Sequence, residues 1–319
     1  MISSRAVEAI ESSDTDELLR VVDGYCSARS WDELTELRHR CAEAVARGKQ
    51  VWGVEEHIRY RLALEAPASI AAPVVAEGQS RFALGPLPEV AASTKAWVDL
   101  EPHLPPGPEK ETVAAERVVR GETIDFPIPD LPPSLRPWEP DYPVATYKKD
   151  KVEAPSPGLP ATSEEPLPGA ITPIEDTHST AALGDLVEPW TDQSSGRSQT
   201  VAVEGDHLAA IAALGLATAR VAGLGTAEAF AWMAWAAASG GAHGRRRGAA
   251  AGRYLAWWVV ASLADLDWPA AAEDVAEAAE GLAWHWFDDG SPDSGWVLRI
   301  AVSSADLGIS WAISATDQT

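Results

Sequence analysis

The sequence predicts an α+β protein dominated by helices, and three observations lead to this class. Apolar residues recur at helical spacing through the first hundred residues. Eighteen of the twenty-four prolines lie between residues 101 and 200, which disfavours regular structure there. In the last forty residues the apolar period changes from 3.6 to 2, which is typical of strands. We therefore expect a helical domain at 1–125, a proline-rich strap and flexible linker at 126–197, and a tryptophan-rich α+β domain at 198–319.

The N-terminal domain begins with helices whose starts are visible in the sequence. Asp14 and Ser30 each stand three residues before a glutamate, which is the pattern of an N-cap. Apolar residues follow at intervals of three and four, at Leu34, Leu37, Cys41 and Val45, and again at Val51, Val54, Ile58 and Leu62. Helices of about 12 to 18 residues joined by very short turns predict antiparallel hairpins, as in a bundle or a solenoid-like fragment. Further helices are expected at about 86–99 and 109–120.

The proline-rich middle contains two kinds of segment. Residues 150–180 have the composition of a flexible linker. Residues 137–147 are too aromatic for a free linker, because Trp138, Tyr142 and Tyr147 alternate with prolines. We interpret this piece as an extended strap docked on the chain's own surface. The alternative is a polyproline-type ligand in which these three aromatic residues bind a partner protein.

The C-terminal domain is expected to open with a short strand at 198–203. Helices follow, the first running from Asp206 to about Gly223 and the others at about 226–238, 246–265 and 270–280. Three runs of alternating apolar residues then predict a three-stranded antiparallel meander with turns at 288–295 and 303–308.

Tryptophan marks the core of this domain. Nine of the fourteen tryptophans lie between Trp232 and Trp311. Burying one indole is worth roughly 4 to 6 kcal/mol, so most of them must be packed. We expect the tryptophan-lined face of the meander to pack on the helix that carries Tyr254, Trp257 and Trp258.

Composition limits the function classes. The net charge is −23, and no third of the chain is basic, so general polyanion binding and nucleic-acid binding are disfavoured. Two cysteines, the absence of an apolar leader and the absence of a long apolar run predict a cytosolic protein that does not enter a membrane. The lack of asparagine and the excess of arginine over lysine resemble proteins of high-GC bacteria.

The densest basic cluster is the sharpest candidate site. Its members, which stand at the start of a predicted helix, are His243, Arg245, Arg246, Arg247 and Arg253. The start of a helix favours anions, so these residues could bind a phosphate or a carboxylate, with the Trp257 ring lining the site. The favoured interpretation is nevertheless that the arginines pair with nearby carboxylates of the same chain, and contact with a partner protein is another possibility. Nucleic-acid contact through the same cluster is a further alternative.

No catalytic constellation is recognisable, and we predict neither a metal nor a cofactor. The nucleophile elbow Gly-x-Ser-x-Gly is absent and the seven histidines lack zinc-type spacing. His285 and the acidic loop Asp288, Asp289 and Asp293 fit a packed histidine and a hairpin turn better than a metal site. The leading hypothesis is therefore a non-catalytic interaction or scaffold protein whose partner is another protein. The alternative is a C-terminal domain that binds an anionic small molecule or acts on it.

Overall fold

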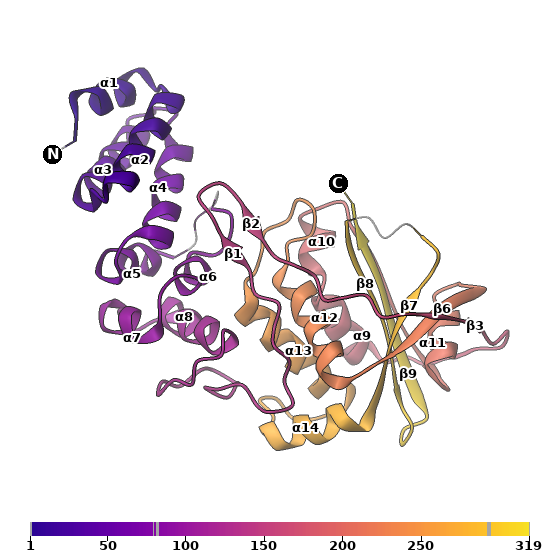
Figure 1. The fold of residues 1–319 in the computed structure, drawn as a ribbon. Helices are drawn as coiled ribbons and strands as arrows, with labels where there is room; N and C mark the ends of the chain where they lie inside the picture. The colour runs from indigo at the N-terminus through magenta and orange to yellow at the C-terminus, as the bar shows by residue number, and fades with distance from the viewer. Residues whose placement is uncertain (1, 79, 81–82, 292–294, 319) are drawn as a thin grey trace. The chain divides into compact units, whose positions relative to one another are not determined.

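A computed structural model describes residues 2–78, 80, 83–291 and 295–318. The chain divides into a helical unit, Met1–Arg117 with Ala145–Glu153, and a sheet unit, Val118–Val144 with Ala154–Thr319. The helix-rich α+β class is confirmed (Figure 1). The chain passes three times from one unit to the other, so the predicted strap and linker is shared between them. Most of it belongs to the sheet unit, and residues 145–153 belong to the helical unit.

The helical unit consists of short helices in sequence, and of the two N-caps expected at Asp14 and Ser30 only Asp14 makes the side-chain hydrogen bond. The Asp14 carboxylate accepts a hydrogen bond from the Glu17 backbone N–H at 3.0 Å and begins α2. Ser30 precedes α3 without a side-chain cap. The predicted helix at 86–99 is interrupted, because residues 93–96 separate α6 from α7. The elements are α1 (Ser4–Ser12), α2 (Thr15–Ala28), α3 (Trp31–Ala46), α4 (Trp52–Glu65), α5 (Ala68–Ala76), α6 (Leu87–Ala92), α7 (Trp97–Leu100), the 3-10 helix η1 (Glu101–His103) and α8 (Pro108–Val119).

A hairpin from the middle of the sequence completes this unit. Its strands β1 (Thr146–Tyr147) and β2 (Val152–Glu153) pair antiparallel. The Tyr147 hydroxyl donates to the buried Glu89 carboxylate at 2.5 Å, and the Tyr60 hydroxyl donates to the Lys148 carbonyl. Lys149 pairs with Asp23 at 2.6 Å. These contacts join three residues of the helices, Asp23, Tyr60 and Glu89, to the hairpin, which is therefore an integral part of the unit.

The sheet unit is built on one antiparallel sheet of seven strands in the order β3-β6-β7-β8-β9-β5-β4. The three-stranded meander of the prediction is thus wrong as a complete sheet, although β7, β8 and β9 are neighbours within the larger one. The strands are β3 (Ser163–Pro166), β4 (Thr172–Pro173), β5 (Arg197–Glu204), β6 (Thr218–Leu224), β7 (Leu282–Asp288), β8 (Trp296–Ser304) and β9 (Ile309–Asp317). The helices are α9 (Thr177–Asp185), α10 (Glu188–Asp192), α11 (His207–Ala213), α12 (Thr226–Ala238), α13 (Ala249–Leu263) and α14 (Ala272–Gly281). Among the described residues, none of the chain's helices combines the length and the apolar character that crossing a bilayer requires.

Strand β6 replaces the second half of a predicted helix. Helix α11 ends before Gly215, whose φ of +90° continues the chain in a conformation that glycine adopts easily. Beyond this turn, burial alternates between exposed Thr218, buried Ala219, exposed Arg220 and buried Val221. Alternation of this kind has the period of a strand. The sequence did not reveal it because the segment is short and rich in alanine, which also suits a helix.

The two faces of the sheet carry two separate cores. Trp284, Trp286 and Trp311 lie on one face and share a core with residues of α12 and α13. Helix α12 packs on β7 and β8, and α13 packs on α12 (Figure 1). The tryptophan-lined face of the sheet therefore packs against a helix, but the helix in direct contact is α12 rather than α13, which carries Trp257. Phe287, Ala301 and their neighbours form the smaller core under α11 on the other face.

The sheet must curl around α11. Strands β3 and β4 form its opposite edges, which would be about 29 Å apart in a flat sheet of this size. Residues 167–171 join these edges directly, and a connection of that length spans at most about 21 Å. Leu167 and Ile171 pack against the core under α11. The segment predicted as a flexible linker therefore forms the two edge strands of the sheet, because its backbone pairs with β6 and β5. The residues between these two strands pack over α11.

Two histidines lie stacked where α11 meets the sheet. The His207 and His285 rings are parallel within 4° and 3.5 Å apart between centroids. Burial, reinforced by the neighbouring His207, lowers the pKa of His285 to about 4, while Asp206 opposes this shift. Burial also lowers the pKa of His207, against the charges of Asp206 and Glu165. Both rings are thus neutral near pH 7, as two stacked imidazoles require.

This pair predicts a loss of stability in mild acid. An unfolded histidine takes up its proton near pH 6.5, whereas His285 in the folded chain resists protonation until about pH 4. Stability therefore falls as pH drops through this interval. We expect His285→Gln to remove about 1.5 to 2 kcal/mol of the loss between pH 7 and pH 5 in urea unfolding, with His243→Gln, at an exposed position, as the control variant. Equal pH dependence in both variants would contradict the assignment.

Candidate functional site

The basic cluster predicted from the sequence does not converge on one site. His243 and Arg245 are exposed in the loop between α12 and α13, and Arg253 is one turn inside α13. Arg247 donates to the carbonyls of Ala237, Asp185 and Leu186, and it pairs with Glu188 at 3.3 Å. Burial lowers the pKa of Arg247, against the charges of Glu188 and Asp185. Arg246, which precedes Arg247 in the sequence, is half-buried and has contacts of its own.

The backbone of this loop is also largely occupied. The N–H of Ala242 donates to the buried Asp317 carboxylate at 2.6 Å, and the N–H of Gly241 donates to the Ser239 hydroxyl. The N–H of Arg245 donates to Gln193, and that of Arg247 to the Ala238 carbonyl. A phosphate cradle needs such N–H groups directed at a ligand. Here most of them are directed into the protein.

Arg253 has a structural partner far away in the sequence. Its side chain is 1% exposed and forms a bidentate ion pair with Glu139, whose side chain is 0% exposed, at 2.7 and 2.8 Å. Tyr142 and Trp257 also donate to this carboxylate, at 2.7 and 3.0 Å. The Arg253 guanidinium donates further to the carbonyls of Pro132 and Ser134. The pair therefore fastens the proline-rich strap to α13.

The three aromatic residues of the strap are likewise engaged within the chain. The Trp138 ring lies 5.0 Å from the Trp257 ring and 5.1 Å from the Phe230 ring, between centroids. Tyr142 is buried beside Glu139 in the sheet unit, whereas Tyr147 is buried in the helical unit. Trp257 is 0% exposed. These contacts are those of an intramolecular strap.

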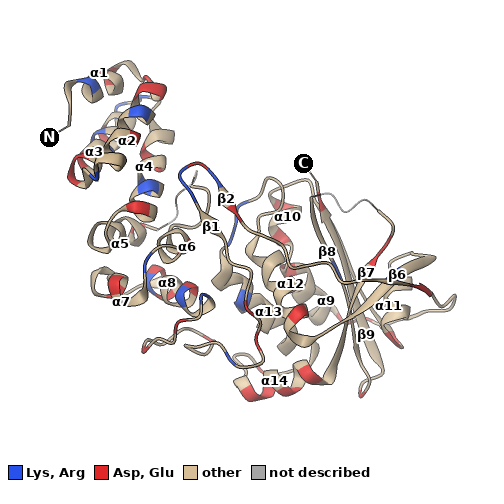
Figure 2. Cartoon of the chain, viewed as in Figure 1, with Lys and Arg blue, Asp and Glu red and all other residues tan. Residues whose placement is uncertain are grey.

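The acidic loop of the sheet unit is an ion-pair partner as well. Asp289 lies 2.8 Å from the buried Arg299 guanidinium, and Asp288 lies 3.8 Å from it. Both aspartates accept hydrogen bonds from turn N–H groups, while Asp293 lies outside the described residues. Within the described part of the chain, no three acidic, histidine or cysteine side chains are grouped for a metal ion. Helix α14 adds four acidic residues to this unit (Figure 2).

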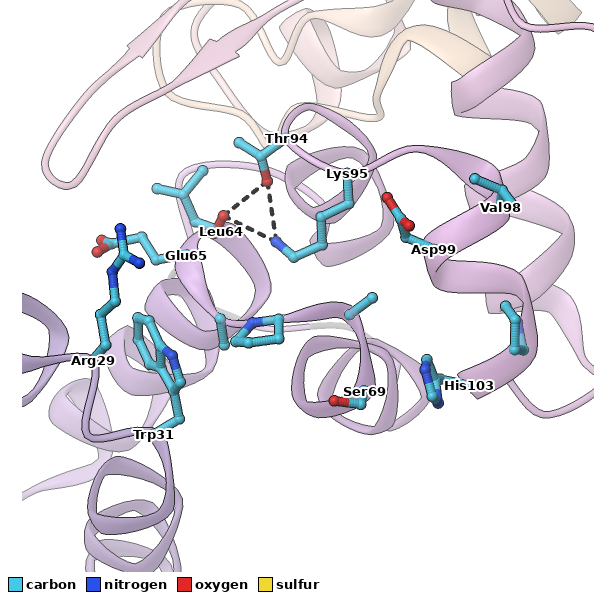
Figure 3. A pocket seen from close by; sticks show the side chains of 14 residues that line it. Arg29, Trp31, Leu64, Glu65, Ser69, Thr94, Lys95, Val98, Asp99 and His103 are labelled. Carbon is cyan, nitrogen blue, oxygen red and sulfur yellow. Dashed lines mark hydrogen bonds between the residues drawn. The ribbon is translucent and has the colours of Figure 1, made fainter.

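An open cavity of about 760 Å³ lies in the helical unit. Three chain segments converge on it: the α2–α3 turn at residues 29–31, the α4–α5 turn at residues 64–69, and the α6–η1 stretch at residues 94–103. Its lining mixes apolar side chains, among them Trp31, Val98 and Pro102, with charged ones (Figure 3). Nine of the fourteen lining residues are exposed.

Lys95 occupies the centre of this cavity's polar wall (Figure 3). Its Nζ donates to the carbonyls of Ala63 and Leu64, at 2.6 and 3.0 Å, and to the Thr94 hydroxyl at 3.1 Å. The two carbonyls belong to the last turn of α4, where a cation is favoured by the helix dipole. Burial lowers the pKa of Lys95 to about 8, although Glu65 opposes the shift.

Sequence reasoning missed this cavity because its signal is tertiary. Lys95 stands in Thr94-Lys95-Ala96-Trp97, which matches no binding motif. The turns that meet there are separated by about thirty residues each. Val98 is an apolar residue between Trp97 and Asp99 that the folded chain leaves 74% exposed, and its sequence context does not indicate this exposure.

Comparison with known protein families shows that a family model covers most of the chain. The model of a family of unknown function, DUF6183, matches residues 16–318. No curated protein matches the chain, and no solved structure matches it.

Proposed function

The chain belongs to this family of unknown function, DUF6183, and from its geometry we propose that it is a non-catalytic protein-interaction protein of the bacterial cytosol. Its helical unit binds a peptide segment of a partner protein in the open cavity. The sheet unit, with its internally paired arginines and aromatic strap, acts as a stable body that carries the helical unit.

The observation that carries this proposal is the exposed apolar surface at the cavity. Val98 is 74% exposed, more than the other exposed large aliphatic side chains of the described residues. It lies in the cavity wall with Trp31, Pro67 and Pro102. Val98 and Trp31 lie at opposite ends of the cavity (Figure 3), so each end offers an apolar side chain that can anchor one side chain of a partner.

The openness of the cavity favours a peptide over a small substrate. Sites for small molecules enclose most of the ligand surface and exclude water. This cavity instead has a rim of exposed residues from three turns. A peptide that crosses such a rim can contact all three turns at once, as ligands of helical-repeat proteins do on concave surfaces.

The proposal is tested with a phage-displayed random peptide library panned on the full chain. We expect selected peptides to bind with micromolar affinity and Val98→Asp to weaken binding at least tenfold, because a charge replaces the apolar anchor. Val7→Asp is the matched control, since Val7 is also exposed (47%) but lies on α1, outside the cavity lining. Isothermal titration calorimetry measures the affinities.

Two outcomes would contradict the proposal. In one, panning yields no peptide that binds the free protein in solution. In the other, Val98→Asp and Val7→Asp bind the selected peptides equally well, which would place the contact elsewhere.

A further inference from the structure

The charges of the cavity indicate the chemistry of the segment that it binds. Resting on the proposed function, we infer that the segment carries an acidic side chain, which Lys95 and Arg29 hold as a carboxylate.

Lys95 forms no ion pair with a carboxylate of the described residues, and the Glu65 carboxylate acts on its charge only from beyond ion-pair distance. The three hydrogen-bond acceptors of Lys95 are two backbone carbonyls and the Thr94 hydroxyl, all uncharged. The Thr94 hydroxyl itself donates to the Leu64 carbonyl at 2.8 Å. An incoming carboxylate can therefore take the place of Thr94 at Nζ while Thr94 keeps a partner. The gain is a charge-assisted hydrogen bond in a half-buried site.

Arg29 supplies a second cation at the same cavity. It occupies the C-cap of α2 with φ of 54°, and its side chain has no ion-pair partner among the described residues. The nearby Glu65 carboxylate is already paired with the buried Arg61. Glu65 therefore repels an incoming anion less than an unpaired carboxylate would.

The remaining charged groups define an orientation. Asp99 lies on the opposite side of Lys95 from Arg29 (Figure 3), and His103 lines the cavity near that end. An acidic side chain would therefore approach Lys95 from the side of Arg29, where Glu65 is paired with Arg61, and the Asp99 end suits a polar or basic neighbour. Helices α3 and α5 also begin at the cavity without side-chain caps, so their dipoles add to the field that attracts an anion.

The test compares peptides from the panning experiment with their neutral counterparts. We expect the selected peptides to contain Asp or Glu, and the change to Asn or Gln to weaken binding to the full chain about tenfold or more. Lys95→Met should weaken binding of the acidic peptide similarly and change binding of the neutral peptide little. Lys49→Met is the control outside the cavity, and Lys95→Arg should retain most of the affinity. Affinity should also decline as pH rises above about 8, where Lys95 loses its proton.

Each result decides the inference. Peptides that depend on Val98 but bind equally well with Gln in place of Glu would overturn it and leave the proposed function standing. Displacement of the peptide by millimolar free glutamate or citrate, with binding of these compounds alone, would assign the cavity to a small carboxylate instead. Should Lys95→Met fail to fold, the acidic and neutral peptides on the unaltered chain still give the answer.

Discussion

Replacing Glu139 by glutamine is expected to destabilise the sheet unit by about 3–5 kcal/mol, because the change leaves the Arg253 charge buried without its carboxylate. For a unit of this size, such a loss corresponds to a fall in melting temperature of about 6–20 °C. The carboxylate also accepts from Tyr142, Trp257 and the Arg136 backbone N–H, so the strap loses several attachments at once. Differential scanning calorimetry of the full chain measures the shift.

Glu273→Gln provides the matched control. Glu273 also pairs with an arginine, Arg136, but its side chain is 76% exposed. Exposed pairs contribute about 0–1 kcal/mol, so this variant should melt within a few degrees of the unaltered chain. Equal melting temperatures for Glu139→Gln and Glu273→Gln would show that the buried pair does not hold the strap.

The buried pair of Arg253 and Glu139 also makes stability depend on pH in a defined direction. Despite desolvation, the hydrogen bond and charge of Arg253 lower the pKa of Glu139 below its usual value near 4.5. Its contribution is therefore complete above that value and is lost as pH falls through the lower folded-state pKa. Glu139→Gln should lack this part of the acid-induced loss.

Gly252→Ala is the second change with a large expected effect. A Cβ at this position would lie 2.3 Å from the Ala234 carbonyl oxygen and 3.1 Å from the Ala238 Cβ. Helices α12 and α13 would have to separate at the centre of the tryptophan core, at an expected cost of about 2–3 kcal/mol. Urea unfolding followed by tryptophan fluorescence reports it, since most tryptophans lie in this unit.

The control for this prediction should change stability in the opposite direction. Gly184 lies in α9, and a Cβ there would meet nothing within 4 Å. Gly184→Ala should therefore stabilise the unit by about 0.5–1 kcal/mol through helix propensity. If both variants unfold at the same urea concentration, α12 and α13 do not approach as closely as described.

The sequence predicts the parts of this fold that local patterns control. Asp14 begins a helix because its carboxylate caps the next turn, and the alternation at Trp284 and Trp286 places both indoles on one sheet face. The edge strands at 163–166 and 172–173 escape prediction, since pairing with β6 and β5 supplies the hydrogen bonds that stabilise them. Local composition there is that of a linker.

The candidate sites show the same division. A cluster of arginines is visible in the sequence, but Glu139 lies 114 residues before Arg253 and nothing local links them. The cavity around Lys95 arises from three turns that only the folded chain brings together. Charge density along the sequence therefore identified the more conspicuous basic cluster, whereas tertiary packing formed the cavity.

Hydrogen–deuterium exchange of the full chain, with and without a selected acidic peptide, shows whether the cavity around Lys95 is the surface that binds the peptide. We predict slower amide exchange confined to the turns at residues 29–31, 64–69 and 94–103. Protection that appears instead in the basic loop at residues 239–248, with no change at those three turns, would contradict it.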